Sequence, residues 1–187
     1  MKQSRNKLKV SPKRGALILI IIEILGFFLL YLSSQVTQFI LQGIMFLVSM
    51  IVIWYASHPL AHAMFAKIFG VPILFFYVGR SEMGRMGNST TIAKKVSPFL
   101  ITIGTKLDRS KLSIMSRNRR AWTLGAGALV GIVILAIIES FAIASFRFGL
   151  FSLIFGGLFF TLTIGTELLL STKSGDLFKM KEQFASS

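Results

Sequence analysis

Cysteine is absent from this 187-residue sequence, and histidine occurs only twice, at His58 and His62. The absence of cysteine excludes disulfide bonds, thiolate metal sites and a cysteine nucleophile together. Any metal ion bound by side chains of this chain must therefore be held by histidine and carboxylate groups. With two histidines, the search for such a site is short.

Charged residues are also scarce along much of the chain. They make up 15% of the residues, whereas 53% are apolar, and the mean hydropathy is +0.72. Long stretches of the sequence contain no charged residue, and a soluble protein of this length does not need such stretches to form its core. The composition therefore predicts an integral membrane protein.

Acidic residues are few in comparison with basic ones. Seven Asp and Glu residues stand against 21 Lys and Arg residues, which gives a formal net charge of +14. In a soluble protein this excess would suggest nucleic acid as the partner, but here the basic residues lie between apolar runs. We expect them to set the membrane topology and to meet a lipid bilayer with anionic headgroups, with 117–120 as an interfacial phosphate anchor and no nucleic acid bound.

Four apolar runs predict four transmembrane helices, at residues 15–32, 39–55, 121–145 and 149–170. At about 1.5 Å per residue such runs match the hydrocarbon thickness. The first run is followed by a poor cleavage site at residues 31–35, so we interpret it as an uncleaved span. The expected fold class is an all-α integral membrane protein with four transmembrane helices and a small cytoplasmic β segment.

The distribution of basic residues predicts the orientation. Six lie in residues 1–14, ten in residues 80–120 and three in the last tail, against one, Arg147, on the other side. Both termini and the long loop should therefore be cytoplasmic. The predicted organisation is a basic tail at 1–14, a four-span membrane domain at 15–172 with a cytoplasmic loop at 80–120, and a tail at 173–187. Residues 71–79 and 99–105 have strand character.

The two histidines lie four residues apart. On a helix they would share one face with Cβ atoms about 5–6 Å apart, and could reach one ion at about 2.0–2.1 Å. This spacing is the ligand half of the H-E-x-x-H motif, but Pro59 takes the glutamate position. Pro59 implies either a kinked helix or a new helix that starts with Ser57 as N-cap, and Gly70 should end the helix.

The layout resembles the membrane core of the site-2 protease family of intramembrane zinc metalloproteases. His58 and His62 fall on the two histidines of the family motif. Further likenesses follow in chain order, a Gly-Val…Phe…Gly pattern and then a basic residue before a small-residue helix entry: Gly70, Val71, Phe75, Gly79, Arg120 and residues 125–128. The Pro and Asn of the family's helix entry are missing here.

The resemblance implies a zinc ion whose third ligand comes from the end of the last span. Asp176, in Ser174-Gly175-Asp176, takes the place of the aspartate in the family's Leu-Asp-Gly. The order of Gly and Asp is reversed, and Asp176 can equally be interpreted as a solvated charge beside Lys179. The implied metal ligands are thus His58, His62 and Asp176.

Pro59 affects catalysis more than binding. The glutamate of H-E-x-x-H enzymes takes and returns a proton, a contribution of roughly 10²–10⁴-fold that proline cannot make. Glu167 and Glu82 are the candidates for a substitute base. We therefore expect a multi-pass membrane protein with a His/His/Asp site, degenerate or altered in catalysis; if active, it would be a zinc-dependent intramembrane peptidase acting on a membrane-inserted peptide or protein. The alternative is a non-enzymatic membrane scaffold or partner-binding subunit with structural histidines.

Overall fold

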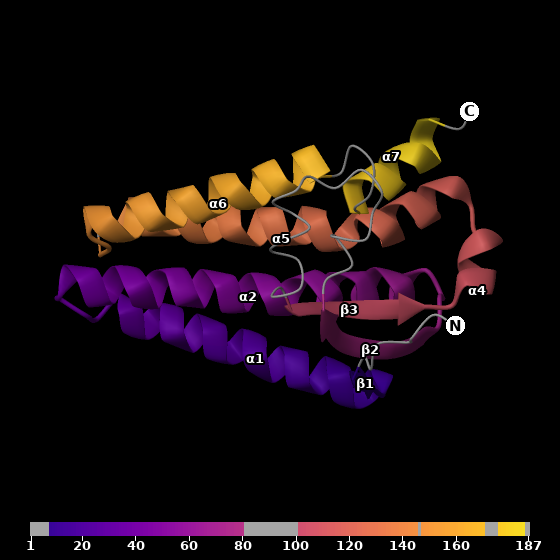
Figure 1. Cartoon of the computed structure of the whole chain (residues 1–187), viewed down its shortest axis with the longest axis horizontal. Helices are drawn as coiled ribbons and strands as arrows, with labels where there is room; N and C mark the ends of the chain where they lie inside the picture. The colour runs from indigo at the N-terminus through magenta and orange to yellow at the C-terminus, as the bar shows by residue number, and fades with distance from the viewer. Residues whose placement is uncertain (1–7, 81–100, 146, 171–175, 186–187) are drawn as a thin grey trace.

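The chain forms a helical bundle with a small sheet at one end (Figure 1). The computed structural model describes residues 8–80, 101–145, 147–170 and 176–185. In chain order the elements are β1 (Leu8–Val10), α1 (Pro12–Ser33), α2 (Phe39–Ile68), β2 (Ile73–Arg80), β3 (Ile101–Leu107), α4 (Arg109–Ser113), α5 (Arg117–Ser145), α6 (Leu150–Leu170) and α7 (Asp176–Ala185).

Three of these helices, α1, α2 and α5, are long and apolar enough to cross a membrane. Their outer faces expose many large apolar side chains, as helices in contact with lipid do. Together they suggest a membrane protein. The fourth predicted span corresponds to α6, but its fully described part, Leu150–Gly165, is too short to be counted with the other three. The fourth span and the orientation therefore stay predictions.

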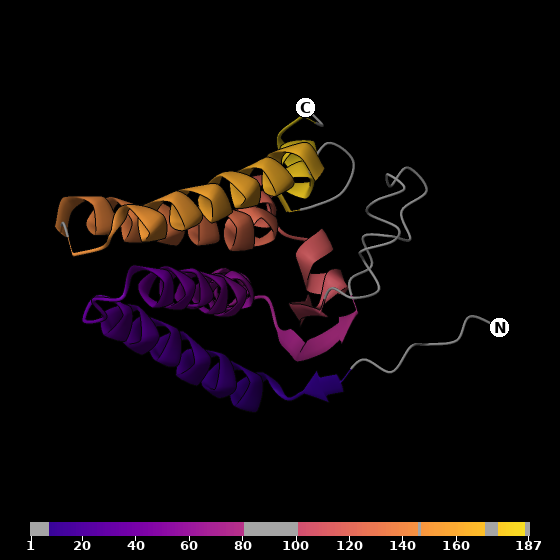
Figure 2. The same cartoon turned by 60° about the vertical axis from the view of Figure 1, so that its left-hand side comes forward.

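The helices lie in two layers. Figure 2 shows α1, α2 and the strands on one side and α5, α6 and α7 on the other. Between them α2 packs against both α5 and α6. One cluster of apolar side chains, each at most 6% exposed, fills part of this interface: Phe46, Met50, Ile53, Leu135, Ile138, Ala142 and Phe148.

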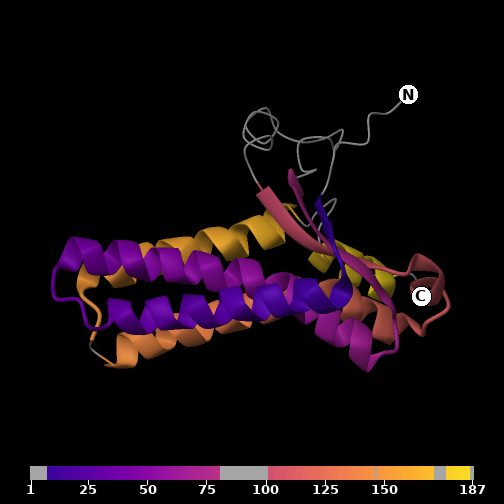
Figure 3. The ribbon, with the colours of Figure 1, turned by 90° about the horizontal axis from the view of Figure 1, so that it is seen from below.

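The sheet has the order β1-β2-β3, with both pairs antiparallel. It crosses one end of the bundle (Figure 3). The predictions of strands at 71–79 and 99–105 are confirmed by β2 and β3. In contrast, β1 was not predicted, because a segment of only three residues within the basic tail carries too little pattern. Phe76 of β2 is 2% exposed and packs against Leu19 of α1 and Ala56 of α2, which fixes the sheet to the helices.

Pro59 does not start a new helix, so the prediction of an N-cap at Ser57 is wrong. α2 continues from Phe39 to Ile68 with Pro59 inside it. The hydroxyl of Ser57 lies 2.8 Å from the carbonyl oxygen of Ile53, one turn back in the same helix, rather than near the following backbone N–H groups. Pro59 is buried within α2, and its carbonyl accepts a hydrogen bond from Thr105 of β3 at 2.9 Å.

The end of α2 follows the prediction. Gly70 has φ of +72°, a left-handed conformation that glycine adopts without a steric penalty. The N–H of Val71 donates to the carbonyl of Ala66 at 2.7 Å, and the N–H of Gly70 donates to that of Lys67 at 3.2 Å. These bonds are typical of a glycine-terminated helix, and they turn the chain into β2.

The segment predicted as a phosphate anchor has another use in this fold. A guanidinium nitrogen of Arg120 donates to the carbonyls of Ser113 at 2.7 Å and Met115 at 3.1 Å, at the end of α4. Arg117 donates to the carbonyl of Phe184 near the end of α7. Two of the three arginines therefore satisfy helix ends that would otherwise lack partners.

Candidate metal site

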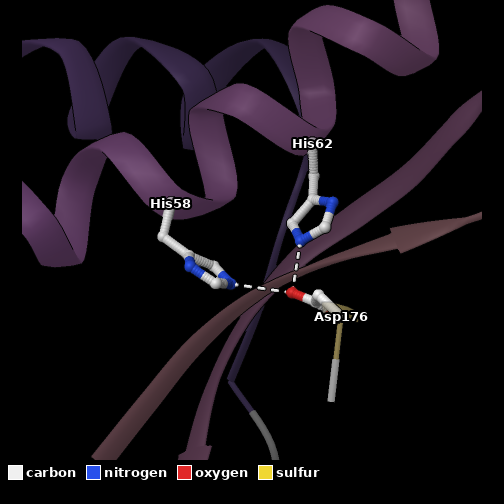
Figure 4. Close-up of side chains that lie close together, drawn as sticks. All are labelled: His58, His62 and Asp176. Atoms are coloured by element: carbon white, nitrogen blue, oxygen red, sulfur yellow. Dashed lines mark hydrogen bonds and ion pairs between the residues drawn. The ribbon is translucent and has the colours of Figure 1, made fainter. Parts of the chain in front are cut away.

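His58 and His62 of α2 converge on Asp176, the first residue of α7 (Figure 4). The Oδ2 atom of Asp176 lies 3.0 Å from Nε2 of His58 and 2.8 Å from Nε2 of His62. The ligand atoms of the three residues all lie within 4.8 Å of one another. The histidines share one helix face, as their spacing predicts, and the structure brings Asp176 to that face from more than 110 residues away.

The third residue reaches the site because α7 packs on α5. Arg117 at the start of α5 binds the carbonyl of Phe184, and the side chain of Met180 lies against Gly125. The sequence pattern predicts a tail at 173–187 that carries Asp176, but no helix in it. Its helix was missed because it is polar overall, and its amphipathic pattern becomes a stable helix only against a partner surface.

The hydrogen bonding of His62 determines which of its nitrogens faces the site. Its Nδ1 lies 2.9 Å from the backbone carbonyl of Thr123 on α5. A carbonyl oxygen only accepts, so Nδ1 must carry the hydrogen that it donates. In the neutral ring Nε2 is then an unprotonated acceptor. It lies 2.8 Å from a carboxylate oxygen, which is also an acceptor. Such a contact is favourable only with a positive charge between or on the two groups.

Asp176 is held as a carboxylate. Burial by itself would raise the pKa of Asp176. In the metal-free protein, hydrogen bonds from His58 and from His62, which can donate from Nε2 only as an imidazolium, outweigh burial and keep that pKa well below its usual range. The other oxygen, Oδ1, accepts a bond from Lys179 at 3.1 Å. Lys179 therefore leaves Oδ2 as the oxygen directed at the two rings.

The three side chains have the chemistry of a divalent metal site. Two imidazole nitrogens and one carboxylate oxygen suit zinc and other first-row metals, and a fourth position is open for water. In a tetrahedral zinc site ligand atoms lie roughly 3.3 Å apart. The observed separations of 2.8 and 3.0 Å would need to grow by only a few tenths of an ångström. The side chains are 14–21% exposed, so the site is partly open to solvent.

The carboxylates predicted as substitute bases are not placed at the site. Glu82 lies outside the described residues, and Glu167 lies in α6 at a position where the side chain is not described. Pro59, in the glutamate position of the motif, is buried, and its carbonyl accepts a hydrogen bond from Thr105 of β3 at 2.9 Å. It therefore has a structural contact to the sheet.

Of three further residues near the site, Thr123 was missed by sequence reasoning, because it acts through its backbone carbonyl, which leaves no pattern in the sequence. Lys179, named above as a neighbour of Asp176, acts through an exposed ammonium group. Glu23 lies in α1, and its Oε1 is 2.7 Å from the hydroxyl of Ser57, directly before His58. An acidic residue within an apolar run was the available signal, since such residues usually have a partner inside the bundle.

Comparison of the chain with protein-family models, with curated proteins and with solved structures finds no match. Within the described residues, the fold and the site define a predominantly helical protein with three membrane-length helices and a His/His/Asp cluster.

Proposed function

We propose that this protein is a membrane-embedded metalloprotein that binds one divalent ion, preferentially zinc, through His58, His62 and Asp176. The contact between Nε2 of His62 and Oδ2 of Asp176 carries the proposal. Thr123 fixes the hydrogen of His62 on the opposite nitrogen, so a cation between the two acceptors would turn an unfavourable contact into two coordinate bonds.

The competing explanation is a proton in place of the metal. His62 as an imidazolium would form an ion pair with Asp176, and His58 could donate from Nε2 as a neutral ring. The histidines would then be structural, as in a scaffold or partner-binding subunit. The two explanations differ at Nε2 of His62, which carries a hydrogen in the ion pair and coordinates the ion in the metal site.

The ion would supply Lewis acidity and a bound water whose pKa is lowered to about 7. The chain's own residues hold and orient it: Thr123 sets the tautomer of His62, and Lys179 occupies the second oxygen of Asp176. Pro59 offers no proton acceptor beside His58. We infer a relative of the site-2 protease family whose catalysis is degenerate or altered, with a membrane-inserted peptide or protein as the partner.

We further propose that the end of the molecule with the sheet faces the cytoplasm and anionic lipid headgroups. β3, α4 and α7 gather at this end (Figure 1). Basic side chains there outnumber the acidic ones, and they include Lys106, Arg109, Lys111, Lys179 and Lys181. Such a charge distribution suits the leaflet with negative surface potential.

The test is the metal content of the full-length protein purified in mild detergent and dialysed against zinc. We expect about one zinc ion per chain, and a loss of most of it in His62→Ala and Asp176→Asn. Asp108→Asn is the matched control, since it makes the same chemical change at an exposed carboxylate that caps α4. If the wild type carries no metal at saturating zinc, or if Asp176→Asn retains it, the proposal fails and the structural-histidine scaffold is the better account.

A further inference from the structure

On α5, the residue that lies against the imidazoles of His58 and His62 is a glycine, Gly127. Gly127 of α5 lies one turn after Thr123, whose carbonyl binds His62. A Cβ atom at position 127 would lie 2.8 Å from Nε2 of His58 and 2.7 Å from Cδ2 of His62, and nearer still to Nε2 of His62. Real Cβ atoms essentially never have neighbours this close.

The missing side chain therefore lets the two imidazoles lie close against α5 while their Nε2 atoms face Asp176. We propose that Gly127 is a positioning residue of the metal site, which admits the two rings to the positions between α2 and α5 from which they bind the ion. This inference rests on the proposed function. It adds Gly127, which has no side chain and therefore could not be found by a search for residues that could be metal ligands.

The predicted consequence of adding a methyl group is selective. The atoms that a Cβ would meet belong to two imidazole rings, which can rotate, and not to backbone. Alanine also favours a helix more than glycine does. We therefore expect Gly127→Ala to fold, with the rings displaced and the ligand geometry lost, although every ligand is still present.

Two other glycines provide matched controls. A Cβ at Gly131, one turn further along α5, would lie 3.1 Å from Cδ1 and Nε1 of Trp54 and would meet no ligand atom. A Cβ at Gly165 of α6 would have nothing within 4 Å. Both changes share with Gly127→Ala the gain in helix propensity. Gly165→Ala adds no contact, whereas Gly131→Ala adds a contact to Trp54, whose ring centroid lies 5.8 Å from that of His58, so Gly165→Ala is the cleaner control.

The experiment is a titration of the full-length protein in detergent with Zn²⁺ and, separately, with Co²⁺ followed by visible absorption. Gly127→Ala should lower zinc affinity by roughly 10- to 100-fold or more, the range seen when groups that support metal ligands are changed. It should also alter or abolish the Co²⁺ spectrum, which a merely structural role would leave intact. Gly131→Ala and Gly165→Ala should bind and absorb like the wild type.

A stability measurement keeps the inference testable if Gly127→Ala folds poorly. In a His58→Ala/His62→Ala background the methyl group has space, so Gly127→Ala should no longer lower the melting temperature of the metal-free protein. An equal loss in both backgrounds would overturn the inference. The inference would also be overturned if Gly127→Ala bound zinc like the wild type while His62→Ala did not. In that case the proposed metal site itself would still be supported. A wild type that binds no zinc would overturn both.

Discussion

Two buried polar clusters tie α2 to the other layer of the bundle, and they differ in how well their hydrogen bonds are satisfied. At one end the amide of Gln42, 5% exposed, donates to the carbonyl of Arg147 at 2.9 Å. Its oxygen accepts from the N–H of Gly149 at 2.8 Å and lies 3.3 Å from the hydroxyl of Ser152. This cluster uses both ends of the amide.

The cluster of His58, His62 and Asp176, toward the other end of α2, leaves some of its hydrogen-bonding groups unsatisfied within the described residues. Nδ1 of His58 has no partner among the described residues, and Nε2 of His62 has no hydrogen to donate to the carboxylate oxygen unless the ring is an imidazolium. Buried polar groups are normally satisfied, because an unsatisfied one costs about 1–3 kcal/mol. The Gln42 cluster is thus satisfied by the chain itself, whereas the histidine cluster groups three side chains that could hold a metal ion.

The largest expected effect is stabilisation by zinc, which should depend on the histidine cluster and not on the Gln42 cluster. Zinc at about a thousand times its dissociation constant should stabilise the wild type by about 4 kcal/mol, because it binds the folded state. His62→Ala should lose this stabilisation, and Gln42→Ala should keep it. Thermal unfolding in detergent with zinc and with a chelator measures both. Equal zinc stabilisation of all three proteins would contradict the assignment of the ligands.

The next effect should appear in the metal-free protein. Gln42→Ala leaves the carbonyl of Arg147 and the N–H of Gly149 without their partner, so it should destabilise the fold by about 1–3 kcal/mol. His62→Ala removes a cluster that is not satisfied on its own, and we expect a smaller loss. Chemical unfolding of both variants under chelation compares them. A larger loss for His62→Ala would mean that the histidine cluster is structural.

Lys179 should affect the metal and not the fold. Its side chain is 50% exposed, and an exposed ion pair contributes only about 0–1 kcal/mol to stability. It nevertheless occupies Oδ1 of Asp176, so Lys179→Ala should weaken zinc binding by roughly 10-fold through the freed carboxylate. Lys181→Ala on the same helix is the control. Unchanged zinc affinity in Lys179→Ala would show that Lys179 does not support metal binding by Asp176.

The smallest expected effect appears on acidification, where Asp176 takes up a proton. Its pKa is depressed in the folded protein, so its contribution is fully present above the unfolded value of about 3.9 and is lost as the pH falls toward the folded value. The stability difference between metal-free wild type and Asp176→Asn should thus stay constant just above pH ~5 and shrink below pH ~4. A difference that does not change on acidification would argue against the depressed pKa.

Much of the architecture could be predicted from local pattern. Apolar runs indicated the helices that became α1, α2 and α5, and β-branched and aromatic residues indicated β2 and β3. Local pattern failed at Pro59 in one of its two alternatives, the new start at Ser57, because α2 continues through the proline. It failed again at β1 and α7, which are too short or too polar to be recognised without the surfaces that they pack on.

The sequence by itself determined that the chain is apolar and helical, and that His58 and His62 share a helix face, because helical periodicity is a local property. Only the tertiary structure decided that α7 packs on α5 and delivers Asp176 to that face, that the carbonyl of Thr123 fixes the hydrogen of His62, and that Gly127 leaves space beside both rings. These relations join residues more than 60 positions apart. They depend on packing between elements, which no spacing along the chain encodes.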